Sequence, residues 1–236
     1  MKPRTTDVHH EALYWENVAT TRRYVRHTSE IEKKAIIKTL SLATKPTTAL
    51  EIGCEGGRWS KLLSDAGWKL ICTDTNQQAL NICQERIPTA TCILVNADDL
   101  ELHCDTESVG LILCIEVPEV INASWFTNEV FRVLQKRGLI VGIFFNRLSW
   151  RGVLHHFTTF LKGGLPYVYR YSYPNWRKSW HEKGFSLTYE EGFGWSPLSK
   201  TSDSPLVPVV TRIEHYLGLR RIISLSPLIV FIAQKD

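Results

Sequence analysis

Acidic side chains near the carboxyl ends of three predicted strands are the residues of this chain best suited to bind a charged ligand. The stretch Ala-Leu-Glu-Ile-Gly-Cys-Glu-Gly-Gly at 49–57 carries Glu51 and Glu55 around Gly53. A glycine at 53 permits a sharp turn, and the glycines that follow let a ligand approach the backbone closely. Asp74 ends the next apolar run, 23 positions after Glu51, and Asp98 follows the third. A carboxylate at 74 could accept both hydroxyls of a ribose, and one at 98 could reach a ring edge beyond it.

The spacing of the glycines argues against a nicotinamide cofactor. That cofactor needs G-x-G-x-x-G, so that its pyrophosphate can rest on a helix N-terminus. Here the glycines are Gly53, Gly56 and Gly57, and Glu51 and Glu55 would repel a pyrophosphate. Two carboxylates suit a cofactor with positive charge, and S-adenosylmethionine has a sulfonium and an ammonium. The plainer alternative is a glycine-rich turn that binds nothing.

These residues make the chain resemble the class I S-adenosylmethionine-dependent methyltransferases, in particular the small-molecule type related to the ubiquinone-biosynthesis methyltransferases. Glu51, Gly53 and Gly57 match the first motif of that family, Glu55 replaces its middle glycine, and Asp74 matches its ribose-binding acid. The resemblance covers about residues 47–146 and implies S-adenosyl-L-methionine as the cofactor. The cofactor-binding positions that we expect from it are Glu51, Gly53, Cys54, Glu55, Gly57, Asp74, Thr75, Asp98, Asp99 and Cys114.

Two departures from the family pattern leave the catalytic base open. The stretch from Asp98 to Gly110 resembles a family segment that begins with an adenine-binding aspartate, but its terminal aspartate is replaced by Gly110. The sequence at 116–120 resembles a segment that often reads Glu-Val-Leu-Glu-His. The histidine, thought to help deprotonate the acceptor in some relatives, is here Val120. The remaining candidates for a base are Glu116, Glu119, His155 and His156.

Apolar runs that alternate with helical patterns predict the scaffold. The runs lack a period of two, which indicates strands covered on both faces, and their alternation with helices predicts βαβ units and a parallel sheet. The predicted strands are 48–52, 68–73, 91–95, 109–115, 139–145, 185–191 and 228–233. The predicted helices are 11–42, 59–66, 77–86, 125–134, 149–161, 175–182 and 207–217. The family architecture implies an α/β, Rossmann-like, mostly parallel sheet of seven strands in the order 3-2-1-4-5-7-6, with strand 7 antiparallel and helices on both faces.

The length of 236 residues suits a single domain. Within 1–236 we expect an N-terminal helical cap over 1–46 and a cofactor-binding core over 47–146. By the family architecture, the segments 147–184 and 192–227 are expected to cover the acceptor.

Aromatic residues concentrate in the expected acceptor region. Of 25 rings in the chain, 13 lie between Trp150 and Trp195. They could pack a lid onto the sheet, or hold an apolar or aromatic acceptor by stacking. If 167–173 is extended, its four alternating tyrosines share one face. The predicted acceptor-binding residues are Tyr14, Trp150, Tyr167, Tyr171 and Trp195.

Charge and composition limit the classes of acceptor, location and metal site that we expect. The net charge of +4 comes from scattered basic pairs, whereas nucleic-acid binders usually concentrate them on one face. We therefore expect a small-molecule acceptor. An RNA or protein acceptor, or a cofactor-binding module without catalysis, stays as an alternative. The polar first ten residues and the short apolar runs predict a cytoplasmic protein without a membrane span. Six cysteines without zinc or redox spacing predict buried thiols and no metal site.

Overall fold

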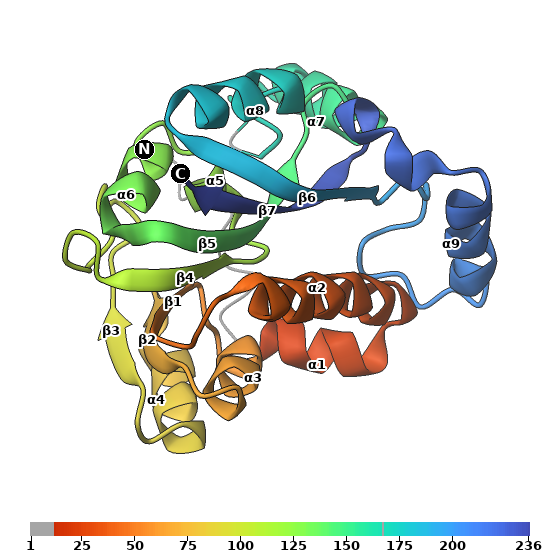
Figure 1. Cartoon of the computed structure of the whole chain (residues 1–236). Helices are drawn as coiled ribbons and strands as arrows, with labels where there is room; N and C mark the ends of the chain where they lie inside the picture. Colours follow the sequence, from red (N-terminus) through yellow and green to blue (C-terminus); the bar gives the residue numbers. More distant parts are fainter. Residues whose placement is uncertain (1–11, 167) are drawn as a thin grey trace.

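The computed structural model describes residues 12–166 and 168–236. Seven strands form one sheet in the order β3-β2-β1-β4-β5-β7-β6 (Figure 1). Strands β1 to β5 pair in parallel, and β7 is antiparallel to both β5 and β6. The predicted fold class and strand order are therefore confirmed. The strands are β1 (Thr48–Ile52), β2 (Lys69–Asp74), β3 (Thr91–Leu94), β4 (Val109–Cys114), β5 (Leu134–Phe145), β6 (Phe185–Phe193) and β7 (Leu228–Lys235).

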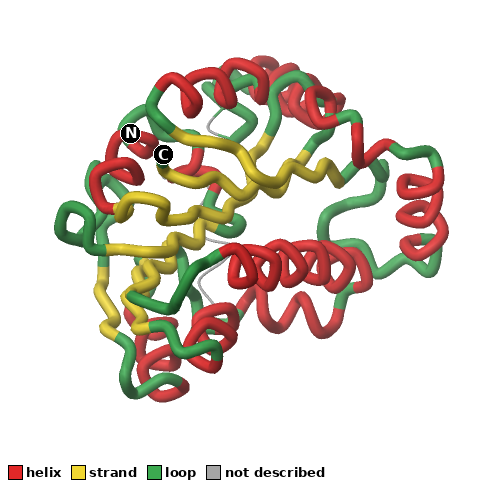
Figure 2. Tube along the Cα trace, viewed as in Figure 1, coloured by secondary structure: helices red, strands yellow, loops and turns green. Residues whose placement is uncertain are grey.

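Helices cover both faces of this sheet. In Figure 1, α1 to α4 lie below the strands, whereas α7 and α8 lie above them, and Figure 2 shows the same layers by type of element. The α-helices are α1 (Tyr14–Thr21), α2 (Arg23–Leu42), α3 (Arg58–Asp65), α4 (Gln77–Arg86), α5 (Pro118–Ile121), α6 (Phe126–Val133), α7 (Trp150–Leu161), α8 (Tyr173–Glu182) and α9 (Val207–Tyr216). Two short 3₁₀ turns, η1 (Leu219–Arg221) and η2 (Ile223–Leu225), lead into β7.

The N-terminal cap differs from the single helix predicted over 11–42. Arg22 has an extended backbone (φ −114°, ψ 124°) and separates α1 from α2. The backbone N–H of Arg23, at the start of α2, donates to the Asp203 carboxylate at 3.2 Å, and the Arg23 guanidinium pairs with the same carboxylate. An anion at a helix N-terminus is favourable because the helix dipole is positive there. A contact 180 residues away in sequence thus gives α2 its own start.

The described part of the tyrosine-rich segment, 168–173, is not extended, so the condition for one shared face of tyrosines is not met. Tyr169 has φ +57°, Ser172 is the N-cap of α8, and Tyr173 is already helical. Pro174 follows within the first turn of α8, where a missing N–H costs no hydrogen bond. Tyr173 is buried while Tyr171 is exposed.

Many of the aromatic rings pack α8 onto the sheet. The Trp176 ring lies 4.6 Å from the Phe231 ring and 4.9 Å from the Phe144 ring, centroid to centroid. Trp180 is fully buried, and its ring lies 4.8 Å from that of Phe185. Such pairs at 4.5–7 Å add to core stability. This part of the aromatic excess therefore builds the hydrophobic core, as the packing alternative expects.

Candidate functional site

The loop after β1 requires glycine at two positions. Gly53 and Gly57 have φ of +69° and +78°, which side chains rarely tolerate. A Cβ at Gly53 would lie 2.7 Å from the Val117 Cγ2, and one at Gly57 would lie 2.7 Å from the Cys83 Sγ. The backbone of this loop therefore packs directly on its neighbours at the carboxyl end of β1. Ligands bind at this place in open α/β sheets.

Asp74 is fixed against the same loop. One of its carboxylate oxygens accepts the backbone N–H of Glu55 and the other accepts that of Asn76, each at 2.9 Å. Thr75 lies beside it and is exposed. Each oxygen keeps a lone pair for a further donor. The carboxylate is thus held at the end of β2 and can still bind a diol.

Glu51 and Glu55 have different surroundings, although both flank the loop. Glu51 is 3% exposed, accepts a hydrogen bond from the Ser60 hydroxyl, and has its pKa raised to about 8 by burial. The Glu55 carboxylate accepts the backbone N–H groups of Trp15 at 2.6 Å and Glu16 at 3.2 Å. Burial also raises the pKa of Glu55. The Glu55 charge is directed at the first turn of α1, so it holds the cap against the loop.

A small cavity of about 50 Å³ lies between the loop, the cap and the segment 192–227. Glu32 from α2 and Glu116 after β4 line it, as do Arg58 and Lys200. Lys200 pairs with Glu116, and an Arg58 nitrogen lies 3.5 Å from the Glu32 Oε2. The Glu32 Oε2 and the Glu116 Oε1 are buried, and neither accepts a hydrogen bond from any part of the chain that the structure describes. Each of these two glutamates at the cavity thus has a buried carboxylate oxygen without a hydrogen bond, although Arg58 lies beside that of Glu32. The lining residues are Trp15, Val25, Thr28, Ser29, Glu32, Glu51, Gly53, Cys54, Glu55, Arg58, Trp59, Ile115, Glu116 and Lys200.

Glu32 was not among the predicted site residues. It is 2% exposed, and burial, followed by the neighbouring charge of Glu116, raises its pKa to about 8. A signal was available in the sequence, because Glu32 lies on the apolar face of a helix with Ile31, Ala35 and Ile36. A carboxylate at a helix position that should be buried indicates a functional or paired group.

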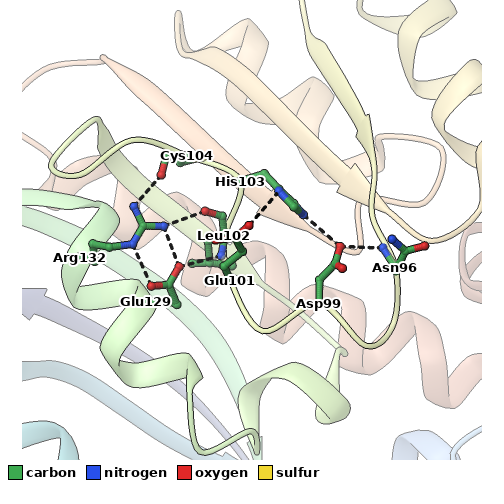
Figure 3. Close-up of polar contacts among 8 residues, drawn as sticks. All are labelled: Asn96, Asp99, Glu101, Leu102, His103, Cys104, Glu129 and Arg132. Atoms are coloured by element: carbon green, nitrogen blue, oxygen red, sulfur yellow. Dashed lines mark hydrogen bonds and ion pairs between the residues drawn. The ribbon is translucent and has the colours of Figure 1, made fainter.

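The loop after β3 is tied to α6 and to itself (Figure 3). The Asp99 carboxylate accepts the backbone N–H of Asn96 at 2.9 Å and lies 3.1 Å from the His103 Nε2, and these contacts lower its pKa. Asp98 precedes it in the same loop, past the carboxyl end of β3. The Arg132 guanidinium donates to the carbonyl oxygens of residues 102 and 104 at 2.9 and 2.8 Å. Asp99 therefore stabilises the loop in which Asp98 lies.

Of the four candidate bases, the structure brings only Glu116 into the cavity. Glu116 has φ +61°, a strained conformation that is common at functional sites. Glu119 is exposed on α5. On α7, the His156 Nε2 lies 2.7 Å from the carbonyl oxygen of Tyr169, and the His155 ring packs against the Tyr169 ring at 5.7 Å. Neither histidine lines the cavity.

None of the predicted acceptor-binding residues in the described ranges is among the residues that line this cavity. Tyr14 packs edge-on against Trp15 at 5.1 Å, and it is Trp15 that lines the cavity. Trp150 and Tyr171 are exposed. The Trp195 indole N–H donates to the Ser226 hydroxyl at 3.2 Å. Tyr167 lies outside the described residues.

Three cysteines meet beneath the glycine loop. The Sγ atoms of Cys54, Cys72 and Cys83 lie within 4.8 Å of one another, and all three side chains are buried. Their spacing in sequence gave no sign of this cluster, because they come from the loop, β2 and α4. Cys114, at the carboxyl end of β4, is also buried, and burial raises the pKa of its thiol.

Comparison with known proteins agrees with this geometry. Residues 50–142 match the family model described as a methyltransferase domain. The fold resembles geranyl diphosphate C-methyltransferase from Streptomyces coelicolor A3(2), solved with Mg²⁺, geranyl diphosphate and S-adenosyl-L-homocysteine (TM-score 0.61, 13% identity, covering 98% of this chain and 88% of that one). It also resembles an S-adenosylmethionine-dependent methyltransferase from Mesorhizobium loti (TM-score 0.59, 15% identity, covering 86% and 96%).

A third similar structure is a complex between the Haloferax volcanii Trm112 methyltransferase activator and a methyltransferase (TM-score 0.61, 11% identity, covering 94% of each chain). No curated protein sequence matches the chain. At these identities the solved structures show a common fold, and the matched domain contains the glycine loop, Asp74 and Glu116. Residues 50–142 are therefore matched as a methyltransferase domain, and the chain shares the fold of solved S-adenosylmethionine-dependent methyltransferases.

Proposed function

We propose that this enzyme transfers a methyl group from S-adenosylmethionine to a small, apolar or aromatic metabolite. The observation that carries the proposal is the cavity beside the glycine loop, which Glu32 and Glu116 line together with Arg58 and Lys200. One buried carboxylate oxygen of each glutamate accepts no hydrogen bond from the described residues. Two carboxyl groups and two cations around one cavity are complementary to the amino-acid end of the cofactor, which carries an ammonium and a carboxylate, and an ammonium beside Glu32 would favour the ionised form of its buried carboxyl.

Different residues of this chain would bind different parts of the cofactor. Asp74 would bind the ribose hydroxyls, since its carboxylate is already fixed by two backbone N–H groups. Asp98, by the family resemblance, would contact the adenine. Glu32 would accept from the ammonium, while Arg58 and Lys200 would donate to the carboxylate. Gly53 would let the backbone approach the cofactor closely.

The charge pattern at the cavity favours a small acceptor over RNA. Lys200 is paired with Glu116, and Arg58 lies beside Glu32, so the cations that line the cavity already have acidic partners. A nucleic-acid site would present cations to phosphates instead. The walls also include Trp15, and the Lys200 Nζ lies over its ring, 4.5 Å from the centroid. The relation to quinone-modifying enzymes rests on the sequence resemblance alone.

When bound, the cofactor supplies an activated methyl group on its sulfonium. The chain contributes mainly orientation, because an in-line displacement depends on holding donor and acceptor in the correct geometry. The cap, held to the loop through Glu55, would exclude water from the site. For an acceptor that must lose a proton, Glu116 is the base that we propose, since among the four candidates it alone faces the cavity.

Titration calorimetry with S-adenosylhomocysteine and with 5′-methylthioadenosine tests the cofactor site. The second ligand keeps the adenosine but lacks the amino-acid end. We expect Asp74→Asn to weaken both ligands, and Glu32→Gln to weaken S-adenosylhomocysteine alone. Loss of a charge-assisted hydrogen bond corresponds to roughly tenfold or more in affinity. Glu30→Gln is the matched control, because Glu30 is exposed on the same helix. An equal loss of both ligands in Glu32→Gln would contradict its assignment to the amino-acid end.

The acceptor class is tested separately with cofactor labelled in its methyl group. The enzyme is incubated with a cell extract and the products are divided into small molecules and acid-precipitable material. Label in the small-molecule, solvent-extractable fraction supports the proposal. Label that precipitates and is released by ribonuclease or protease would show an RNA or protein acceptor instead.

A further inference from the structure

Helix α7 turns its apolar side to solvent. Its exposed apolar residues recur at intervals of three and four, which places them on one stripe of the helix. They are 52–78% exposed: Val153, Leu154, Phe157, Phe160 and Leu161. The polar side of α7 faces the protein instead, since the Arg151 guanidinium donates to the carbonyl oxygens of Gly194, Ser196 and Leu198.

Helix α9 has the same inverted arrangement. The residues on its inner side are Val207, Thr211 and Glu214, two of which are polar. Glu214 accepts the backbone N–H of Trp195 at 3.3 Å. The apolar residues of this segment lie on the outer side and are 50–88% exposed: Leu206, Val209, Ile213, Tyr216 and Leu217.

Two stripes of this kind indicate binding surfaces. A surface helix normally packs its apolar stripe on the core, and soluble monomers rarely expose large contiguous apolar patches. Helices α7 and α9 belong to the segments inserted between β5 and β6 and between β6 and β7, and lie along the outer side of the molecule in Figure 1. Neither stripe is needed to hold its helix in place, because polar contacts do so.

The charges beside the stripes identify the partner as anionic. Besides Arg151, which faces the protein, the sequence 147–172 contains the exposed cations Arg147, Lys162 and Arg170, and no aspartate or glutamate. The sequence 204–227 contains the exposed Arg212 and Arg221, whereas its third arginine, Arg220, pairs with Glu191, and its one acidic residue, Glu214, is buried. Apolar and aromatic residues on one face, with flanking cations, are typical of helices that lie in a membrane interface. None of the helices in the described ranges combines the length and apolarity needed to cross a bilayer.

We propose that α7 and α9 dock this enzyme onto an anionic lipid bilayer, with their apolar stripes in the interface and their cations at the headgroups. The inference goes beyond the proposed methyl transfer and does not depend on it. It also predicts the side from which an acceptor would reach the enzyme, namely from the membrane, because both docking helices lie in the segments expected to cover the acceptor.

Vesicle flotation of the full chain tests the docking. The probes are vesicles of phosphatidylcholine alone and of equimolar phosphatidylcholine and phosphatidylglycerol. We expect the wild type to float with the anionic vesicles and to be released by added salt, because salt screens the attraction. The double variant Phe157→Gln/Phe160→Gln should bind the anionic vesicles at least roughly tenfold more weakly than the wild type, because it removes apolar area from the interface. Ile37→Gln is the control, since Ile37 is equally apolar and 49% exposed on α2.

Several outcomes would overturn the proposal. It fails if the wild type floats with neither vesicle, or if the double variant floats as well as the wild type. It also fails if sedimentation shows a wild-type dimer that the double variant abolishes without any vesicle binding, because the stripes then cover each other. Circular dichroism shows whether the variant is folded, and Ile213→Gln on α9 repeats the test on the second helix. Calorimetry with S-adenosylhomocysteine remains independent, so loss of docking and loss of the cofactor site are distinguishable.

Discussion

The buried carboxyl group of Glu51 should make the enzyme less stable as the pH rises. Burial raises its pKa from 4.5 to about 8, and the opposing contributions of the Ser60 hydroxyl and the Arg58 charge are smaller. The neutral acid is therefore favoured in the folded state. Its stabilisation is fully present below the unfolded-state pKa and is lost as the pH rises through the folded-state pKa.

The size of this effect follows from the two pKa values. Over the range from about pH 5.5 to about pH 8.5 the unfolded chain has already lost this proton almost completely, while the folded protein retains it until near pH 8. At about 1.4 kcal/mol per pH unit, the free energy of unfolding should fall by about 3 kcal/mol through this one group. Glu51→Gln keeps a hydrogen-bond acceptor for Ser60 but cannot ionise, so it should remove this part of the pH dependence.

Urea unfolding followed by tryptophan fluorescence measures the difference. The wild type and Glu51→Gln are unfolded at both pH values and at constant ionic strength, so that other titrating groups cancel in the comparison. Glu119→Gln is the control, because Glu119 is exposed. If the wild type and Glu51→Gln lose the same free energy over this range, Glu51 is ionised in the folded protein and the argument from burial is wrong.

Two further variants test the packing of the loop and of the core. Gly57→Ala should destabilise the protein and weaken S-adenosylhomocysteine, because Gly57 has φ +78° and its new Cβ would lie 2.7 Å from the Cys83 Sγ. Adding Cys83→Ala removes the clash and should restore part of the stability measured by urea unfolding. About 1–2 kcal/mol of backbone strain should remain. If the second substitution restores no stability, the clash with Cys83 is not the cause of the loss. Trp180→Ala should lower the free energy of unfolding by about 3–5 kcal/mol, as for other buried aromatic residues. The folded fraction of this variant should bind S-adenosylhomocysteine with unchanged affinity. A changed affinity would link the aromatic core to the cofactor site.

The strands could be predicted from the sequence because their signals are local, whereas their order in the sheet came from the family resemblance. The run at 48–52 is apolar and ends at Gly53, and β1 has the same bounds. The predicted helix 77–86 also has the observed bounds, since Asn76 is an N-cap whose side chain accepts the backbone N–H groups of residues 78 and 79. Strand β5 begins five residues earlier than predicted, at Leu134. Arg137, with φ +63°, lies within this extension, and the pairing with β4 shifts register near Val109.

The site was harder to predict because distant segments complete it. Glu32 comes from the cap and Lys200 from the segment 192–227, and both meet Glu116 at the cavity. The same holds for Glu55. Its place in the glycine loop, between Gly53 and Gly56, suggested a role toward a ligand, but its carboxylate binds the first turn of α1, 39 and 40 residues away in sequence. Motif spacing describes one loop, whereas these contacts depend on how the cap folds over it.

In α7 the spacing of apolar residues predicts the helix but not which of its faces is buried. Apolar residues at intervals of three and four predict a helix, and they would ordinarily also predict which side faces the core. In α7 the core side is instead fixed by Arg151, which donates to three carbonyl oxygens of 194–198. Burying a guanidinium is favourable only with such hydrogen bonds. The position of one arginine among apolar residues therefore decides which face of the helix is left for a partner, and periodicity alone does not contain that choice.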